Sequence, residues 1–474
     1  MTLLAALALA QLGNSALVAA PVDSDWWKTR HLAATKRAQK GNVDLVFVGD
    51  SITHAFGGEP DTQQSFSNRG GDTWSLFYGH RKAMNLGFSG DRTGNVLWRL
   101  DNGELDGVSP KVAVVMIGTN NVGGNTASQI AEGVQAVCRK IKEKCPKTRV
   151  LLLGIFPRGT ATSSDRGKVL NANRALADWA KSTGEVEFQD IGDVFLDARG
   201  EIPKDIMPDM LHPFALGYRK WAMAMEPYLA KMLGDKPVTT YDPRNSAVVP
   251  DTQNRDYPLY DWMPRHQEVL NYHAKNKPNL VFIGDSITHY FGGPPVDDQH
   301  KRGTEVWNFF FGFRKASNLG FGWDRTENVL WRLEHGELDG IAPRAVVLLI
   351  GTNNLDVNTP AEIRDGIAAV LDLIRAKQPK SKIVLLGVLP RGQTPDNPYR
   401  AKIADLNALL PETARAKGAL YLDLSRALLE ADGTIAKETM SDFLHPTARG
   451  YRRLAEGLEP TLRDIFHDVG SGGA

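Results

Sequence analysis

The chain of 474 residues contains one sequence twice, and this repeat constrains its fold more than any other feature. The stretch VDLVFVGDSITHAFGG at residues 43–58 returns as PNLVFIGDSITHYFGG at residues 278–293. Ser286 follows Ser51 by 235 residues, and the later motifs of the repeat follow their counterparts by 233. Solenoid and propeller repeats are only roughly 20–50 residues long. The near-constant offset therefore indicates duplication of a whole domain.

Composition and pattern predict where the two domains begin and end. Residues 1–20 hold a short apolar run followed by small residues, which indicates a signal peptide, although no basic residue precedes Lys28. We therefore expect a secreted or periplasmic protein. Residues 237–256 hold three prolines and no sustained period, which is typical of a linker. The remaining boundaries are a first domain at 21–236, a second domain at 257–467 and a flexible tail at 468–474.

Composition also limits the partners that the chain can have. Lys and Arg number 56 and Asp and Glu number 55, so a net charge of +1 offers no footprint for nucleic acid or an anionic membrane. The N-terminal apolar run is too short to span a bilayer. Cys138 and Cys145 lie in one predicted helix, about 10 Å apart, which is too far for a disulfide. No residues have the spacing of zinc ligands, and we expect no cofactor.

Apolar runs alternate with helical patterns in each half. Continuous apolar runs are typical of strands that are buried on both faces of a parallel sheet. The alternation predicts a doubly wound α/β sandwich, in which ligands bind beyond the carboxyl ends of the strands. In the first half we predict strands at 45–48, 83–86, 112–117, 149–155 and 186–190, and helices at 95–100, 127–144, 166–181 and 216–232.

A serine follows the first predicted strand of each half. Ser51 and Ser286 stand in the motif GDS, where the hydroxyl can lie at the mouth of a cleft. The surrounding residues do not read G-x-S-x-G, so the nucleophile elbow of the α/β-hydrolases is absent. Taken alone, GDS fits equally well a turn in which the serine caps the next helix.

An Asp-x-x-His motif stands near the end of each half, at Asp209 and His212 and at Asp442 and His445. A serine hydroxyl needs a base within hydrogen-bond reach, and that base needs a carboxylate to fix its tautomer. One turn can bring the carboxylate to Nδ1 and leave Nε2 for the serine. A lone motif of this kind is more often an ion pair at a helix start, but its recurrence at one offset favours catalysis.

Asn120 and Asn353 end the third apolar run of each half, in IGTNN. An asparagine amide at this edge can donate to the oxyanion that forms when serine adds to a carbonyl, and one such donor stabilises it by roughly 3–4 kcal/mol. Gly90 would supply a second donor through its backbone N–H, and the N–H of Ser51 a third. In isolation, the Asn pair also fits a simple turn.

Together these blocks resemble the SGNH (GDSL) hydrolases, named for Ser, Gly, Asn and His, which stand here at Ser51, Gly90, Asn120 and His212. The motifs VLWRLDNGEL, PRG and D-x-L-H-x-x-x-x-G-Y are similar to the catalytic subunits of platelet-activating-factor acetylhydrolase Ib. The resemblance covers most of both halves. It implies a flavodoxin-like α/β/α sandwich with a five-stranded parallel sheet in each, no metal, and short acyl groups such as acetyl. The same roles transfer to Ser286, Asn353, Asp442 and His445 in the second half.

The second half departs from the first at Trp323, which stands where the first half has Gly90. Its backbone N–H can still donate to an oxyanion, but a positive φ would cost a tryptophan ~1–3 kcal/mol. We expect the second domain to be slower or to prefer a different acid or alcohol. His54 and His289, three residues after each serine, either line the pocket or lie on the helix surface.

The sequence therefore predicts a serine esterase with two tandem sites that hydrolyse short-chain esters through an acyl-enzyme. Acetylated carbohydrate is an expected substrate only if the chain is exported. A lysophospholipase or thioesterase remains an alternative, as does a second domain that binds ligands without catalysis. The two domains can also pack as an intramolecular pseudo-dimer, because tethering raises their effective concentration.

Overall fold

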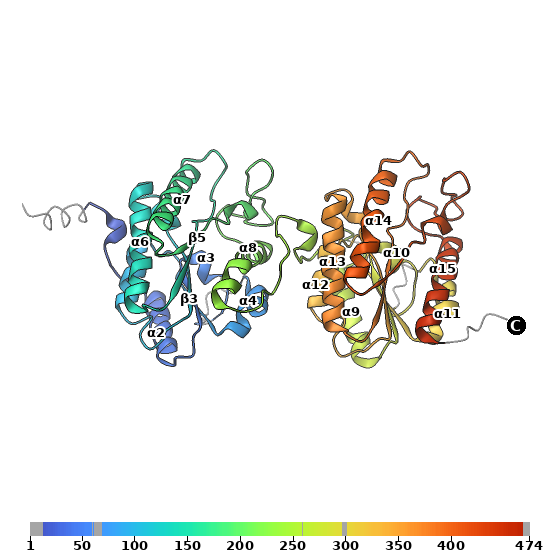
Figure 1. Ribbon diagram of the computed structural model, residues 1–474, viewed down its shortest axis with the longest axis horizontal. Helices are drawn as coiled ribbons and strands as arrows, with labels where there is room; N and C mark the ends of the chain where they lie inside the picture. Colours follow the sequence, from blue (N-terminus) through green and yellow to red (C-terminus); the bar gives the residue numbers. More distant parts are fainter. Residues whose placement is uncertain (1–12, 59, 61–68, 258, 296–300, 468–474) are drawn as a thin grey trace, which may run out of the picture. The chain divides into compact units, whose positions relative to one another are not determined.

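The computed structural model describes residues 13–58, 60, 69–257, 259–295 and 301–467. The chain divides into two compact units, Met1–Arg244 and Asn245–Ala474 (Figure 1). Each unit is an α/β/α sandwich around one five-stranded parallel sheet, which confirms the predicted fold. In the part of the chain that is described, no helix is both long and apolar enough to cross a membrane.

The strands of the first unit follow the predicted apolar runs. They are β1 (Leu45–Gly49), β2 (Ala83–Gly87), β3 (Val112–Met116), β4 (Arg149–Leu153) and β5 (Glu187–Gln189). Their order in the sheet is β2-β1-β3-β4-β5, and every neighbouring pair is parallel. Successive strands are added on either side of β1, so the sheet has its switch point beyond the carboxyl ends of β1 and β3. Ligands bind at such a point in open α/β sheets.

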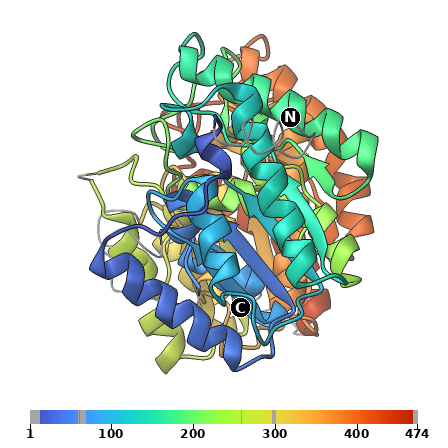
Figure 2. The same ribbon diagram turned by 90° about the vertical axis from the view of Figure 1, so that its left-hand side faces the viewer.

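Helices cover both faces of this sheet. Those of the first unit are α2 (Asp25–Gln39), α3 (Ser51–His54), α4 (Gly71–Tyr78), α5 (Thr93–Asp101), α6 (Ala127–Lys144), α7 (Ser164–Thr183) and α8 (Ala215–Leu233). Figure 2 looks onto the face covered by α2, α5 and α6. On the opposite face, Phe47 of β1 packs against Trp74 of α4 and Trp221 of α8. Sequence analysis predicted neither α2 nor α4.

The second unit repeats this arrangement. Its sheet order is β10-β9-β8-β6-β7, again wholly parallel, and α11 and α15 pack against one hydrophobic core. The elements are β6 (Leu280–Gly284), α10 (Ser286–His289), α11 (Thr304–Phe311), β7 (Ala316–Gly320), α12 (Thr326–Glu334), β8 (Ala345–Leu349), α13 (Pro360–Lys377), β9 (Lys382–Leu386), α14 (Pro398–Ala416), β10 (Leu420–Leu422) and α15 (Ala448–Phe466), with α9 (Trp262–Lys275) before the first strand.

Two segments that were predicted to lie outside the domains contain residues that pack on them. The 3₁₀ turn η1 (Ser15–Leu17) contacts α5 and α6, within the predicted signal peptide. The turn η5 (Ser246–Val248) contacts α12 and α13, within the predicted linker. Residues 1–12 and the predicted tail at 468–474 lie outside the described residues.

Candidate active sites

Each GDS motif forms a tight turn from strand to helix. Ser51 opens α3 directly after β1, and the side chain of Asp50 accepts a hydrogen bond from Ile52 N at 3.0 Å, so the aspartate rather than the serine caps this helix. A Cβ at Gly49 would lie 2.5 Å from the carbonyl oxygen of Met116, which explains the glycine. Ser51 is 8% exposed. The turn thus places the serine at the carboxyl end of the central strand.

In each unit the serine, histidine and aspartate side chains form a hydrogen-bonded triad. Ser51 Oγ lies 2.9 Å from His212 Nε2, and His212 Nδ1 lies 2.7 Å from Asp209 Oδ2. With its proton on Nδ1, the imidazole has Nε2 free to accept the serine proton. The second unit has the same triad, with 2.8 Å at both steps, through Ser286, His445 and Asp442. The predicted catalytic residues are therefore within hydrogen-bond reach in both units.

Both Asp-x-x-His turns contain a residue in the left-handed region. Met210 has φ 55° and Phe443 has φ 58°. Each carbonyl oxygen accepts a hydrogen bond from the glycine of a PRG motif, Gly159 at 2.9 Å and Gly392 at 2.8 Å. The loop after the fourth strand therefore holds the turn that presents the histidine, and sequence analysis missed this role.

The arginine of each PRG motif contacts the asparagine-bearing loop. Arg158 Nη1 donates to the carbonyl oxygen of Thr119 at 2.8 Å, and Arg391 Nη1 donates to that of Thr352 at 3.3 Å. An arginine at this position can anchor a loop or bind a substrate anion. The contacts favour the loop. One motif thus connects the turn that carries the base with the loop that carries the asparagine.

The predicted oxyanion donors lie on the loops after β2 and β3. Asn120 Nδ2 donates to the carbonyl oxygen of Asp91 at 2.9 Å, and Asn353 Nδ2 donates to that of Asp324 at 2.9 Å. This bond uses one of the two N–H groups of the amide and fixes its orientation. The other N–H is then pre-set as a donor, which is what stabilisation of an oxyanion requires.

Position 90 of the first unit and its counterpart in the second both have positive φ. Gly90 has φ 84° and Trp323 has φ 62°, so the tryptophan adopts the strained conformation that the sequence raised as a possibility. A Cβ at Gly90 would meet no atom within 4 Å, and the Trp323 side chain is 50% exposed. The tryptophan therefore adds bulk where the first site is open.

A chain segment that is longer in the second unit contacts this strained turn. Val249 and Trp262 are separated by four residues more than their counterparts in the first unit. The added stretch brings Gln253 Nε2 and Tyr260 Oη to the carbonyl oxygen of Gly322, both at 2.9 Å. Arg255 donates to the carbonyl oxygen of Trp323 at 3.0 Å. These bonds stabilise the conformation that Trp323 disfavours.

A buried network of ion pairs adjoins the turn that carries Gly90 in the first unit and Trp323 in the second, here called the oxyanion turn. Arg99 Nε donates to Asp91 Oδ2 at 2.8 Å, Nη1 donates to Glu104, and all three side chains are fully buried. Trp27 of α2 donates to Asp91 Oδ1 at 2.7 Å. Burial raises the pKa of Asp91 to about 6, against the effect of Arg99. The second unit has the same network, formed by Trp262, Asp324, Arg332 and Glu337.

The two histidines that follow the serines lie behind the same turns. His54 and His289 are buried, so neither lies on the helix surface. His54 Nδ1 lies 2.9 Å from Ser89 Oγ, and His289 Nδ1 accepts the N–H of Gly322 at 3.3 Å. Burial lowers the pKa of His54 to about 3, so this ring is neutral at ordinary pH. Both residues support the oxyanion turn.

Burial and charge set the protonation of the catalytic groups. Burial raises the pKa of Asp209, but hydrogen bonds from the backbone and ring of His212 outweigh it, and the net pKa is lowered. Burial lowers the pKa of His445; Asp442 opposes this, and Arg302 adds to it. The histidine of the second site is therefore neutral, and able to act as a base, to a lower pH than an ordinary histidine.

Aromatic side chains at the rim differ between the sites. In the second unit the Tyr290 ring lies 4.8 Å from that of His445, and the first unit has Ala55 at the corresponding position. In the first unit Phe214 follows the catalytic histidine by two residues and is 43% exposed, with Arg69 4.6 Å above its ring. The side chains that border the two triads therefore differ, although the hydrogen bonds within the triads are the same.

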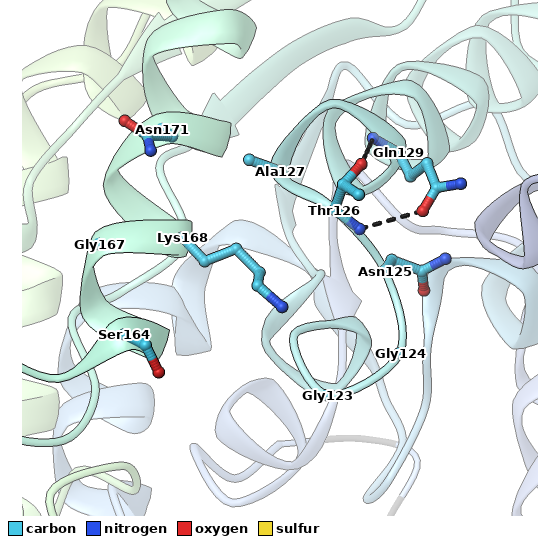
Figure 3. Close-up of a pocket in the computed structure, with 10 residues that line it drawn as sticks. All are labelled: Gly123, Gly124, Asn125, Thr126, Ala127, Gln129, Ser164, Gly167, Lys168 and Asn171. Carbon is cyan, nitrogen blue, oxygen red and sulfur yellow. Dashed lines mark hydrogen bonds between the residues drawn. The ribbon is translucent and has the colours of Figure 1, made fainter.

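A surface cavity of about 690 Å³ lies beside the asparagine loop of the first unit (Figure 3). Its lining comes from the loop before α6, from the first turn of α6 and from α7, and includes none of Ser51, His212 and Asp209. Lys168 reaches across from α7 and donates to the carbonyl oxygen of Val122 at 2.6 Å. Among the described residues, no group of three or more His, Cys, Asp or Glu could hold a metal ion.

Comparison with known proteins identifies relatives of each half. The model of the GDSL-like Lipase/Acylhydrolase family matches residues 47–220 and 282–453. Platelet-activating factor acetylhydrolase IB subunit alpha2 of Rattus norvegicus is 35% identical over 233 residues, which are 48% of this chain and 93% of that protein. Subunit alpha1 of Bos taurus is 38% identical over 215 residues, 45% of this chain and 88% of that protein.

Solved structures match in the same way. A GDSL-like lipase from Bacteroides thetaiotaomicron is 20% identical with a TM-score of 0.33, covering 42% of this chain and 98% of its own. An acetylxylan esterase from Geobacillus stearothermophilus is 19% identical with a TM-score of 0.33, covering 42% of this chain and 96% of its own. The family match spans most of both units, so the chain belongs to the GDSL-like lipase/acylhydrolase family and is a carboxylic ester hydrolase.

Proposed function

We propose that the protein is a tandem serine esterase that hydrolyses acetyl and other short-chain esters, with one active site in each domain. The observation that carries this proposal is the triad of serine, histidine and aspartate, which is present in both units with hydrogen-bond distances of 2.7–2.9 Å. The acetyl preference is supported by relatives named acetylhydrolase at 35–38% identity.

The reaction follows from the geometry of the first site. His212 Nε2 takes the proton of Ser51 as the oxygen attacks the ester carbonyl, and the oxyanion accepts hydrogen bonds from Asn120 and the N–H groups of Gly90 and Ser51. The intermediate collapses, and the imidazolium of His212 protonates the leaving alcohol. Water then attacks the acyl-serine with His212 again as base, which releases the acid and restores the serine. Asp209 keeps the imidazole in the required tautomer.

Serine variants test this proposal. Ser51→Ala and Ser286→Ala, singly and together, are assayed on p-nitrophenyl esters from acetate to octanoate. We expect each single variant to keep the activity of the other domain and the double variant to lose activity by a factor of ~10⁴–10⁶. Full activity in Ser51→Ala together with none in Ser286→Ala, or the reverse, would show that only one domain is catalytic.

The same panel separates the rival functions. A lysophospholipase or thioesterase would hydrolyse long acyl chains or thioesters with a higher kcat/KM than p-nitrophenyl acetate. A second domain that only binds ligands would leave Ser51→Ala inactive on every ester. Acetylated xylan and acetylated sialate extend the panel to the leaving alcohol.

A further inference from the structure

A short sequence repeat lies ahead of the repeat that defines the domains. NSALV at residues 14–18 returns as NSAVV at residues 245–249, with an offset of 231. These residues form the turns η1 and η5, which pack on matching helices of their units. We call the two segments straps. Both straps therefore pack on the folded units.

Each strap bonds to the same two positions of its unit. Ser15 Oγ accepts a hydrogen bond from Asn125 Nδ2 at 2.9 Å, and the carbonyl oxygen of Ala16 accepts one from Thr93 Oγ1 at 2.7 Å. Ala16 is fully buried. In the second unit the corresponding distances are 2.9 and 2.8 Å, from Asn358 to Ser246 and from Thr326 to Ala247.

The two residues that bond to the strap also hold the neighbour of the oxyanion asparagine. Asn121 Oδ1 accepts the N–H of Thr93 at 3.1 Å, and Asn121 Nδ2 donates to Asn125 Oδ1 at 3.0 Å. Asn354 makes the same two bonds at 3.1 and 3.0 Å. Asn121 is 1% exposed, and the residue before it is Asn120. A closed set of bonds therefore links the strap to the loop that presents the oxyanion donor.

These side-chain bonds add to the backbone hydrogen bonds of the loop, from Asn121 N to Gly118 O at 3.0 Å and from Asn125 N to Asn121 O at 2.9 Å. The loop begins at Gly118, with φ 127°, a value that glycine adopts without strain. Lys168 extends toward the loop from α7 (Figure 3) and donates to the carbonyl oxygen of Val122, whereas Asn125 donates to Ser15 Oγ of the strap. Gln129 Nε2 donates to Gly13 O at 3.1 Å.

We propose that the straps are positioning elements for the oxyanion asparagines, and that Ser15 and Ser246 are positioning residues of the two sites. The inference rests on the proposed function, since it assigns Asn120 and Asn353 to the oxyanion. A donor that acts on the transition state affects kcat more than substrate binding. Loss of the strap hydroxyl should therefore lower kcat and leave KM nearly unchanged.

The test uses the full chain with the second site silenced by Ser286→Ala. In this background Ser15→Ala should lower kcat on p-nitrophenyl acetate by about ten-fold, because small misplacement of a catalytic donor is costly. Ser15→Thr, which keeps the hydroxyl, should restore most of the rate. Ser182→Ala, which removes a hydroxyl from the last turn of α7, is the matched control and should have no effect. Ser246→Ala in a Ser51→Ala background repeats the test.

Affinity for a boronic acid gives a second readout. A boronic acid forms a tetrahedral adduct with the serine, and its affinity follows transition-state stabilisation. We expect Ser15→Ala to weaken it by the same factor as kcat. The inference would be overturned if Ser15→Ala left kcat unchanged or raised KM alone. It would also be overturned if Ser15→Thr lowered kcat as much as Ser15→Ala. An inactive Ser286→Ala background would instead refute the proposed function of the first site, so the two failures are distinguishable.

Discussion

Exchange of Gly90 and Trp323 between the units tests how the two sites differ. In a Ser286→Ala background, Gly90→Trp adds a Cβ that meets no atom within 4 Å, and its positive φ imposes backbone strain. At φ 84° this strain is about 1–2 kcal/mol, which lowers Tm of the first unit by roughly 2–8 °C. The reverse change, Trp323→Gly in a Ser51→Ala background, removes that strain.

The substrate readout separates bulk from strain. We measure kcat/KM for p-nitrophenyl acetate, p-nitrophenyl hexanoate and an acetate ester of a bulky alcohol. Strain alone changes all rates together, whereas an indole in the cleft changes the ratio of bulky to small esters. We expect this ratio to fall about ten-fold in Gly90→Trp and to rise by a similar factor in Trp323→Gly, as for contacts of 1–3 kcal/mol in a pocket.

The reasoning fails if neither ratio moves in either variant. It also fails if both variants shift the ratio in the same direction, since the exchange is then not reciprocal. Arg255→Met, which removes the bond to the carbonyl oxygen of Trp323, separates the contribution of the added segment. It should lower Tm of the second unit without changing the ratio.

Three further predictions concern pH and the buried charges. In Ser51→Ala, kcat/KM should fall to half at a pH below about 6.5, because burial lowers the pKa of His445; a pH–rate profile with a higher midpoint would contradict this. Arg99→Met removes the guanidinium that lies between two buried carboxylates and should destabilise the first unit by about 3–5 kcal/mol in urea denaturation, whereas the exposed Arg199→Met should have little effect. Burial raises the pKa of Asp50 from 3.8 to about 7, so the folded unit holds this proton more tightly than the unfolded chain, and Asp50 should contribute a loss of roughly 2–4 kcal/mol of stability between pH 4 and 7. The same pH series on Asp50→Asn should show a loss smaller by that amount, with the part due to Asp91 remaining.

The sequence predicts well those features that depend on local pattern. The five strands of the first unit lie where apolar runs lie, because buried parallel strands need such runs. Helix α6 has the predicted bounds, Ala127–Lys144. The triad of Ser51, His212 and Asp209 is predictable for a different reason. The serine follows β1 at the carboxyl edge of the sheet, and the Asp-x-x-His motif recurs at nearly the same distance from the serine in both halves.

Features that depend on distant contacts could not be predicted in the same way. The strap of the first unit is five residues long and follows an apolar run, so it resembles the end of a signal peptide. Its bonds reach Thr93 and Asn125, which are 77 and 110 residues away from their strap partners. The signal that could have found it is the second copy, NSAVV, whose offset differs because of the four added residues before α9. Trp27 in α2 was missed likewise, since its partner Asp91 lies 64 residues away.

Comparison of the two units shows which hydrogen bonds they share and which side chains near the triads differ. The bonds from strap to asparagine, from arginine to carboxylates and from histidine to aspartate agree in partner in both units, and most agree within 0.2 Å. The differences gather at the cleft instead, where Trp323 and Tyr290 replace Gly90 and Ala55. A unit that had lost catalysis would have no reason to keep the first set, because those bonds serve a donor and a base. The shared bonds therefore support the proposal of one esterase site in each unit, and the differing side chains support the proposal that the two sites prefer different esters.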